Sequence, residues 1–439
     1  MIIKMLQRIL KAIVLVGLVS CEPCNAVGLG ELEVMSKDTV SASALGHLEG
    51  DKILIVQDVD LKGTVCMVPK GKTLVFKKGT IRNGTLVGNN TQIECKKNAF
   101  DKVTIQGKWN VPEISTKLFK DLSYENALKD VVALSYPKVK NSIIIEAGYY
   151  IVKASKESST CISISDNTEL IINGTIRLLS NDLRNYNIIA ASGNSITIKG
   201  KGTIIGDKHT HTGTEGEWGM GISLKGAENT KVSGLTIKDC WGDCIYVGGD
   251  SKNVLIERCT LDHGRRQGIS VTKANGVTIR NCTITNVSGT NPQYAIDIEP
   301  NRRDSVDNIQ IENVIVRDCE GGLLATRGKP KDDAKTPWIG NVTIRNCQVS
   351  CKSKRPISIK RCEEVEIEKC TLYAQKGRTA ISVTETGKAI VRNNTASIDG
   401  SIIEKAKNGA KQIMGKGKDP IHVKTIGQSV VKNNKIIER

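Results

Sequence analysis

The chain has 439 residues, of which 39% are hydrophobic but only 3% are aromatic, and its formal net charge at pH 7 is +17. Few aromatic residues together with 41 Gly favour many short strands joined by tight turns, and argue against a large aromatic-rich core. The positive charge does not indicate a nucleic-acid partner, because the sequence contains no basic stretch interleaved with aromatic residues and no known nucleic-acid-binding module.

The first residues have the pattern of an export signal. Three basic residues precede an apolar run, residues 12–19, which is too short to span a bilayer. We therefore expect an exported protein, located in the periplasm, on the outer membrane or outside the cell. Two processing routes stay open: residues 18–21 resemble a lipobox that ends at Cys21 and would supply a lipid anchor, whereas ordinary cleavage would follow Ala26. No later segment is apolar enough for a transmembrane helix, so only that anchor would contact a membrane.

The mature chain is expected to begin with strand-rich leading coils over residues 27–118, where short apolar runs such as Thr73–Phe76 are punctuated by Gly and Asn. The period then changes over residues 121–134. Apolar residues recur there at helical spacing, namely Tyr124, Ala127, Leu128, Val131 and Val132. This spacing predicts one amphipathic helix in an otherwise strand-forming chain.

A short phrase of alternating apolar residues then repeats along the chain. Its copies are Gly-Ile-Ser-Leu (221–224), Cys-Ile-Tyr-Val (244–247), Gly-Ile-Ser-Val (268–271), Ala-Ile-Asp-Ile (295–298), Leu-Leu-Ala-Thr (323–326), Pro-Ile-Ser-Ile (356–359) and Ala-Ile-Ser-Val (380–383). A second apolar alternation follows each copy, with spacings of 23 to 33 residues. Such a repeat buries its apolar face only by stacking on its neighbours, which predicts an all-β solenoid over residues 119–439 that ends in basic coils.

The entry to this region resembles a known superfamily. A helix containing Ala127-Leu128, an apolar strand and the ending Gly148-Tyr149-Tyr150-Ile151 are similar to the entry of pectate-lyase-like right-handed parallel β-helices, found in secreted bacterial carbohydrate-active proteins. The Gly-rich residues 199–206 resemble a coil that commonly precedes the active region in this superfamily. The resemblance covers residues 119–400 and implies a right-handed parallel β-helix. It does not name a reaction, because the superfamily includes hydrolases, lyases, epimerases, tailspikes and binding proteins.

The 14 cysteines are expected to be free. Four of them fall at one position of the aligned coils, where other coils have Leu235, Val314 and Asn394; these four are Cys259, Cys282, Cys347 and Cys370. Cysteines that exchange with Leu and Val behave as small buried apolar residues. The sequence therefore predicts a buried cysteine ladder, with neither a disulfide framework nor a Cys-x-x-Cys metal site.

The candidate site lies on the outer face of the strands formed by the repeated phrase, because strand alternation sends the residues between the buried ones outward. Stacking the coils gives one outward column of Ser223, Tyr246, Ser270, Asp297, Ala325 and Ser358, and a second of Lys225, Gly248, Thr272, Glu299, Arg327 and Lys360. Asp297 and Glu299 are two residues apart, about 6.5–7 Å along a strand, near the lower end of the carboxylate separation in inverting glycosidases. We predict that they form a catalytic pair, with both side chains projecting outward.

Other residues are expected to bind substrate around this pair. Arg266, Gln267 and Arg327 supply charged and polar contacts, and Tyr246, Lys225 and Trp241 lie on or beside the same face. Trp241, like Trp218 and Trp338, is near a long loop, where it would either stack on a sugar ring or pack a loop base.

Asp243 is a third candidate carboxylate. Trp241-Gly242-Asp243-Cys244-Ile245 and Asp262-His263-Gly264 resemble two motifs of polygalacturonases, which implies roles for Asp243 and His263 in catalysis or substrate binding. The chain departs from that family elsewhere: Glu217-Trp218-Gly219-Met220 replaces Asn-Thr-Asp-Gly, Gly242 replaces an acidic partner, and the Arg-Ile-Lys motif is missing. Polygalacturonase activity is therefore not expected, and Asp243 is alternatively a corner residue bonded to its own turn.

We predict from these observations an exported glycoside hydrolase that needs no cofactor and acts on a polysaccharide or oligosaccharide. The net charge is compatible with an acidic glycan or with diffuse surface charge. Two alternatives stay open. One is a polysaccharide lyase in which Arg327 and Lys360 act as base and acid while Asp297 and Glu299 hold Ca²⁺ against a uronate. The other is a glycan-binding surface protein without catalysis.

Overall fold

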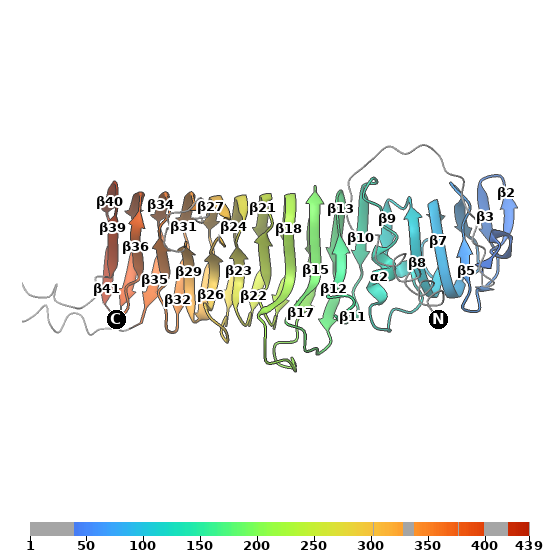
Figure 1. Cartoon of the computed structure of the whole chain (residues 1–439), viewed down its shortest axis with the longest axis horizontal. Helices are drawn as coiled ribbons and strands as arrows, with labels where there is room; N and C mark the ends of the chain where they lie inside the picture. The colour runs from blue at the N-terminus through green and yellow to red at the C-terminus, as the bar shows by residue number, and fades with distance from the viewer. Residues whose placement is uncertain (1–38, 302, 328–337, 376, 399–419, 439) are drawn as a thin grey trace, which may run out of the picture. The chain divides into compact units, whose positions relative to one another are not determined.

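The computed structural model describes residues 39–301, 303–327, 338–375, 377–398 and 420–438 (Figure 1). The described residues from Val40 onward belong to one compact unit. The predicted export signal, including Cys21 and Ala26, lies outside the described residues. Within the described ranges, no helix is both long and apolar enough to cross a membrane.

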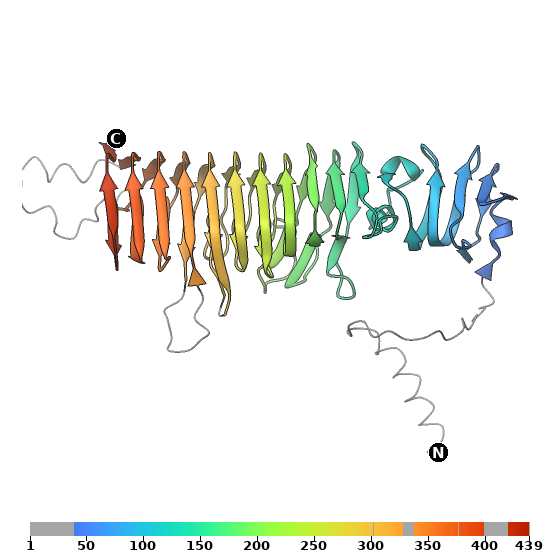
Figure 2. The same ribbon diagram turned by 90° about the horizontal axis from the view of Figure 1, so that it is seen from above.

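From residue 141 onward, the described chain winds through three parallel sheets, and the strands of successive coils lie side by side (Figures 1 and 2). The first sheet contains β12 (Thr160–Ile164), β15 (Asn185–Asn194), β18 (Trp218–Ser233), β20 (Ile245–Gly248), β23 (Gln267–Val271), β26 (Tyr294–Ile298), β29 (Gly321–Thr326), β33 (Ile357–Lys360), β36 (Ile381–Thr386) and β39 (Ile421–Thr425). The second contains β10 (Asn141–Ile145), β13 (Thr168–Ile172), β16 (Thr197–Gly200), the end of β18, β21 (Ser251–Glu257), β24 (Ala274–Arg280), β27 (Ser305–Glu312), β31 (Asn341–Arg345), β34 (Glu364–Glu368), β37 (Lys388–Arg392) and β40 (Ser429–Lys432). The third contains β11 (Tyr149–Val152), β14 (Thr175–Leu178), β17 (Thr203–Ile205), β19 (Thr236–Lys238), β22 (Thr260–Asp262), β25 (Thr283–Thr285), β28 (Ile315–Cys319), β32 (Gln348–Cys351), β35 (Thr371–Ala374), β38 (Thr395–Ile398) and β41 (Lys435–Glu438).

The leading segment is also built of strands, as the sequence predicts. They are β1 (Thr39–Val40), β2 (His47–Glu49), β3 (Lys52–Ile55), β4 (Val59–Asp60), β5 (Val65–Met67), β6 (Thr73–Phe76), β7 (Ile81–Glu94) and β8 (Phe100–Trp109). The pairings among β3 to β8 are parallel, and β2 and β3 form an antiparallel hairpin. The next strand, β9 (Glu113–Ser115), pairs with β10 and so connects this segment to the following coils.

The predicted amphipathic helix is present but shorter than expected. The helix α2 covers Ala127–Val132 rather than residues 121–134, and it buries Ala127, Leu128, Val131 and Val132 as the spacing predicts. It begins late because Asn126 adopts a left-handed conformation with a φ of 61°. The Asn126 side chain accepts a hydrogen bond from the backbone N–H of Lys153, which fixes this turn against the next strand.

Stacked aliphatic side chains fill the interior of the solenoid. The inward residues of the first sheet pair in register from coil to coil, in the order Ile222, Ile245, Ile269, Ile296, Leu323, Ile357 and Ile381. Each of these residues is buried. Burying one such side chain contributes about 1.5–3 kcal/mol, so every additional coil stabilises the stack.

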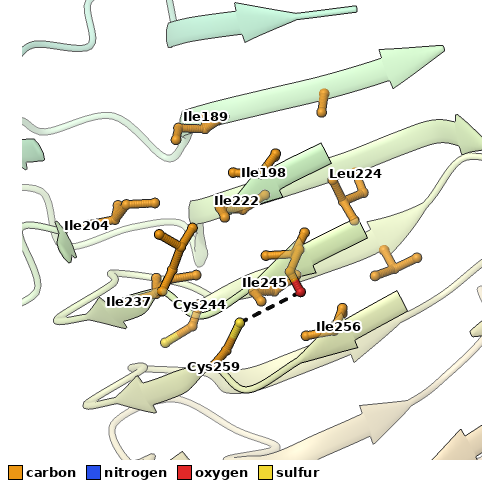
Figure 3. Packing of buried hydrophobic residues seen from close by; sticks show 14 of the residues in the cluster. Ile189, Ile198, Ile204, Ile222, Leu224, Ile237, Cys244, Ile245, Ile256 and Cys259 are labelled. Carbon is orange, nitrogen blue, oxygen red and sulfur yellow. Dashed lines mark hydrogen bonds between the residues drawn. The ribbon is translucent and has the colours of Figure 1, made fainter. Parts of the chain in front are cut away.

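The cysteine ladder is confirmed. The described cysteines are all free, and all except Cys95 are buried. Figure 3 shows Cys244 and Cys259 packed among the isoleucines of neighbouring coils. The Cys282 Sγ lies 3.4 Å from the carbonyl oxygen of Arg280, and burial raises the pKa of the Cys319 thiol to about 12. The buried thiols therefore pack as small apolar groups.

The outer face of the second sheet carries a column of alternating charge, which we call the charge ladder. Register pairing sets its members next to one another in the order Glu257, Arg280, Glu312, Arg345, Glu368 and Arg392. The carboxylate of Glu257 lies 2.8, 2.6 and 2.7 Å from nitrogen atoms of Lys231, Arg258 and Arg280. These cations, Lys231 foremost, lower the pKa of Glu257 to about 2, so this buried carboxylate is well compensated.

Candidate functional site

The predicted outward column on the first sheet is correct except at Ala325, since Ser358 also falls in the column as the partner of Leu324. Ser223, Tyr246, Ser270 and Asp297 pair in this order on β18, β20, β23 and β26. On β29 the partner of Asp297 is Leu324, whereas the expected Ala325 pairs with Ile298 and is buried. The prediction for Ala325 was wrong because Leu323 and Leu324 are both apolar, so alternation alone leaves two registers open on this strand.

The one-residue shift on β29 also moves Arg327 out of the second column. Thr326 pairs with Lys360, and Arg327 follows it at the end of the strand. The Arg327 guanidinium lies 3.7 Å from a carboxylate oxygen of Glu363, and the Lys360 ammonium lies 3.2 Å from Glu385. The prediction that Arg327 occupies the column position beside Glu299 was therefore wrong.

Asp297 lies on the outer face but is enclosed, contrary to the expectation that it projects into solvent. Its side chain is 1% exposed, whereas Glu299 is exposed as expected. The Asp297 Oδ2 accepts a hydrogen bond of 2.6 Å from Gln267 Nε2, and Oδ1 is buried without a hydrogen-bond partner in the described part of the chain. Burial, with a smaller contribution from the charge of Glu299, raises the pKa of Asp297 well above its ordinary value.

Gln267 is buried and donates its hydrogen bond to Asp297, so its side chain is not part of an open surface. Its side chain is fully buried, and Oε1 accepts a hydrogen bond of 2.7 Å from the backbone N–H of Tyr294. Both ends of the amide are therefore engaged, one with backbone and one with the carboxyl. The Lys354 ammonium lies 5.3 Å from the centre of the Tyr294 ring beside this group. The expected role of Gln267 as a direct substrate contact does not fit this enclosed position.

Asp243 is the second enclosed carboxyl. It is 0% exposed, and its Oδ2 accepts a hydrogen bond of 2.5 Å from the hydroxyl of Ser270, in the next coil. Oδ1 is buried and has no hydrogen-bond partner among the described residues. Burial raises the pKa of Asp243, although the charge of Arg266 opposes the change. Asp243 is therefore not a corner residue bonded to its own turn, the alternative that the sequence left open.

Arg266 links the carboxyls of this face. Its Nη1 lies 3.6 Å from Asp243 Oδ2, and its Nε lies 3.6 Å from Glu217 Oε2. Burial lowers the pKa of Arg266, but the charges of Asp243, Glu217, Asp297 and Glu299 outweigh this effect and raise it overall. Glu217 was not among the predicted site residues. Its signal was the replacement of a motif found in polygalacturonases by Glu217-Trp218-Gly219-Met220, which marked this segment as different without assigning the carboxylate a partner.

A cleft opens beside Asp243 and Arg266, with a volume of about 280 Å³. The predicted residues Tyr246 and Lys225 line it, and further lining comes from Asn185, Asn187, Trp218, Met220, Thr272 and Asn301. The Tyr246 hydroxyl lies 2.7 Å from the hydroxyl of Thr272, and the Lys225 ammonium lies 5.4 Å from the centre of the Tyr246 ring. The cleft therefore presents amides, hydroxyls, one ammonium and one half-exposed indole.

Trp241 and His263 are outside the lining of the cleft. Trp241 packs between the His211 ring, at 3.9 Å, and the Arg265 guanidinium, at 3.6 Å, so neither face of its indole is open to a sugar. His263 occupies a turn after the third sheet, where its Nδ1 lies 2.7 Å from Asp262 Oδ2. Within the described residues, no group of three or more His, Cys, Asp or Glu side chains is arranged to hold a metal ion.

Comparison with protein families identifies the class of the fold. A family model described as "Right handed beta helix region" matches residues 135–305. This match agrees with the three parallel sheets and with the resemblance seen in the sequence. The chain has the right-handed parallel β-helix fold.

Two relatives from Bacillus subtilis (strain 168) carry no described function. The SPbeta prophage-derived uncharacterized protein YorA is 23% identical over 348 residues, which cover 71% of this chain and 59% of YorA. The uncharacterized protein YclG is 34% identical over 142 residues, which cover 28% of this chain and 24% of YclG. The chain thus spans less than two thirds of either relative.

Among solved structures, the A-module of mannuronan C-5 epimerase AlgE6 from Azotobacter vinelandii aligns with a TM-score of 0.53. The two chains are 13% identical over 72% of this chain and 84% of that module. At this level of identity, the similarity concerns the fold alone.

Proposed function

We propose that the protein is an exported carbohydrate-active enzyme that hydrolyses glycosidic bonds. One observation carries the proposal: two enclosed carboxyls, Asp243 and Asp297, both with raised pKa values, lie within the electrostatic reach of Arg266 beside an open polar cleft. A carboxyl with a raised pKa is suited to donate a proton to a glycosidic oxygen. Buried carboxyl oxygens without partners are costly, which favours a functional reason for them.

We assign the proton donor to Asp243, because Asp243 is among the residues that line the cleft and Asp297 is not. Its proton would pass to the oxygen of the bond that breaks, and the exposed Glu299 would accept a proton from the attacking water. Asp297 would act through its charge coupling with Glu299 and Arg266. The Arg266 guanidinium would stabilise the negative charge that develops on Asp243 as the proton leaves.

The lining of the cleft suits a saccharide. Asn185, Asn187, Thr272 and Asn301 offer amide and hydroxyl groups for sugar hydroxyls, and Trp218, which is 47% exposed, offers an aromatic face. The fold is also that of an epimerase whose name gives mannuronan as its substrate, in keeping with a polysaccharide ligand. Lys225, the ammonium at the rim, would favour an acidic sugar at one position.

The lyase alternative has less support from the geometry. It requires Arg327 and Lys360 to face the substrate, but both point toward carboxylates of neighbouring coils, Glu363 and Glu385. It also requires Asp297 to bind Ca²⁺, although this carboxyl is enclosed and its pKa is raised, which disfavours the ionised ligand that Ca²⁺ needs.

A glycan-panel digestion tests the proposal. Purified protein is incubated with acidic and neutral polysaccharides while new reducing ends and the near-ultraviolet absorbance of unsaturated uronates are both recorded. Hydrolysis predicts reducing ends without the absorbance, and Asp243→Asn, prepared in the same way, controls for contaminating enzymes. Absorbance that rises with the reducing ends would identify a lyase. Binding without either signal would identify a glycan-binding protein, and both results would overturn the proposed reaction.

A further inference from the structure

The connection between β17 and β18, residues 206–217, contains buried polar groups that the proposed chemistry does not use. It extends beyond the ends of the neighbouring strands (Figure 1). The connection ends at Glu217, which faces Arg266, and is followed by Trp218, which lines the cleft. Whatever fixes this segment therefore fixes one wall of the cleft.

Asp207 anchors the connection from inside. Its side chain is enclosed, and its Oδ1 accepts a hydrogen bond from the hydroxyl of Tyr186 on β15. Its Oδ2 lies 2.9 Å from His211 Nδ1 and accepts a hydrogen bond of 2.9 Å from Asn181 Nδ2. A buried carboxylate with three polar partners is both compensated and held in one orientation.

Stacked planar groups connect Asp207 and His211 to the segment that lines the cleft. The His211 ring lies 3.9 Å from Trp241 at an interplanar angle of 19°, and the Arg265 guanidinium lies 3.6 Å from the same indole. Groups this close to one indole must occupy its opposite faces. Arg265 Nη1 then donates a hydrogen bond of 3.2 Å to the carbonyl oxygen of Gly216, the residue immediately before Glu217. A continuous series of contacts therefore runs from Asp207 to the residue next to the cleft.

Two glycines make room for this arrangement. A Cβ atom at Gly219 would lie 2.4 Å from the Tyr186 ring, and one at Gly242 would lie 2.5 Å from the carbonyl oxygen of Glu217. Any other residue at either position would push the stack or the wall away, because such separations are well inside van der Waals contact. The close approach of Glu217 to the coil of Asp243 thus depends on Gly242.

We propose that Asp207 and His211 are positioning residues that hold Glu217 and Trp218 in place as a preformed wall of the cleft. Simple packing does not account for a histidine here. His211 Nε2 is buried without a hydrogen-bond partner in the described part of the chain, and an apolar ring would fill the same space without that cost. The imidazole is explained by its bond to Asp207. The inference rests on the proposed function only in taking the cleft as the glycan site.

Hydrogen exchange of the backbone amides tests the proposal in the absence of any ligand. His211→Phe keeps a ring in the stack but loses the bond to Asp207, and His211→Ala loses both. His209→Phe is the matched control, since His209 is in the same connection but is exposed and pairs with Asp239 at 3.1 Å. We expect exchange over residues 206–218 to quicken by about tenfold in His211→Phe and by more in His211→Ala, with no change in His209→Phe.

Affinity for two probes, tetragalacturonate and cellotetraose, supplies a second measurement. Whichever probe binds the wild-type protein should bind His211→Phe about tenfold more weakly and His209→Phe equally well. Exchange in His211→Phe that matches the control, or that quickens evenly along the chain with a fall in Tm, would overturn the positioning role. If neither probe binds the wild-type protein, the glycan assignment fails for these two sugars, and the exchange comparison still decides the positioning role.

Discussion

Enclosed carboxyls on two outer faces of the same solenoid have pKa values shifted in opposite directions. In the charge ladder of the second sheet, the enclosed carboxylate of Glu257 meets three cations, and its pKa falls to about 2. On the first sheet, Asp243 and Asp297 share the influence of one arginine, and the pKa of each is raised. Glu257 and Asp297 both lie at positions that repeat from coil to coil, whereas Asp243 lies just before β20.

The difference separates stability from chemistry. Alternating charges in register compensate one another, so Glu257 and its partners hold neighbouring coils together. The carboxyls near the cleft have fewer partners than they can accept, and each keeps one buried oxygen unpaired within the described residues. Such a site is suited to proton transfer, because a group of the substrate can form the hydrogen bond that the unpaired carboxyl oxygen lacks.

Removal of the enclosed carboxyls should produce the largest effect. Asp243→Asn is expected to lower turnover by about 10²–10⁴-fold, the contribution typical of a positioned acid or base, and Asp297→Asn by less, because Asp297 acts only through its charge coupling. Neither should lower the Tm at neutral pH. A raised folded-state pKa means that the carboxyl stabilises the fold at low pH and loses this contribution as the pH rises through that pKa, whereas an amide has no such loss.

Turnover on the glycan that the panel selects, together with thermal melting, measures both outcomes. Asp250→Asn is the control, since this exposed carboxylate pairs with Lys273 at 2.9 Å and is not among the residues that line the cleft. Full activity in both variants would show that neither Asp243 nor Asp297 takes part in the reaction. The first sheet would then have no catalytic role to set against the stabilising role of the charge ladder.

An unpaired carboxyl placed in the apolar interior of the solenoid should lower stability, because no cation or hydrogen-bond donor compensates it there. Cys282→Asp puts such a group in the cysteine ladder and is expected to lower the free energy of unfolding by about 4 kcal/mol. Cys282→Val should cost less than about 1.5 kcal/mol, because Val314 fills the equivalent position of the next coil. Urea denaturation of both variants decides the matter, and equal losses would mean that the coil register is wrong.

Loss of a compensated carboxylate should be the next largest effect. Glu257→Gln is expected to lower the free energy of unfolding by about 3 kcal/mol at neutral pH, from the fall of the pKa to about 2. A lowered folded-state pKa stabilises the fold above the ordinary glutamate value, and this stability is lost as the pH falls toward about 2. Denaturation curves between neutral and acidic pH should therefore converge for wild type and variant. Glu94→Gln, in an exposed pair with Lys52, should change stability by less than about 1 kcal/mol.

The rim of the cleft should give the smallest effect. Lys225→Ala is expected to weaken binding of an acidic oligosaccharide by less than about tenfold, with the loss shrinking as salt is added, because the ammonium is exposed. Titration calorimetry with an acidic and a neutral oligosaccharide separates the charge effect from a general one. Lys252→Ala, an exposed lysine in the following coil, is the control. An equal loss for the neutral sugar would show that Lys225 shapes the cleft instead of reading charge.

The sequence located most of the fold and the approximate position of the site. Period-two alternation placed Asp297 and Tyr246 on one outer face, and exchange of Cys282 with Val and Leu at equivalent positions placed that thiol in the core. The sequence failed on β29, where Leu323 and Leu324 satisfy the pattern equally well. It also gave no sign of the contacts that Asp207 and His211 make with Tyr186, Asn181 and Trp241, because those partners come from other parts of the chain.

What the sequence determined by itself is the stack of coils, since a strand repeat with one apolar face has no other way to remove that face from water. The tertiary structure alone decided which of the outward polar side chains are buried from solvent. Asp297 and Glu299 are two residues apart and point to the same side, yet one is enclosed and the other exposed. The enclosed side chain is bonded to Gln267 of the neighbouring coil, and local alternation carries no information about such contacts between coils.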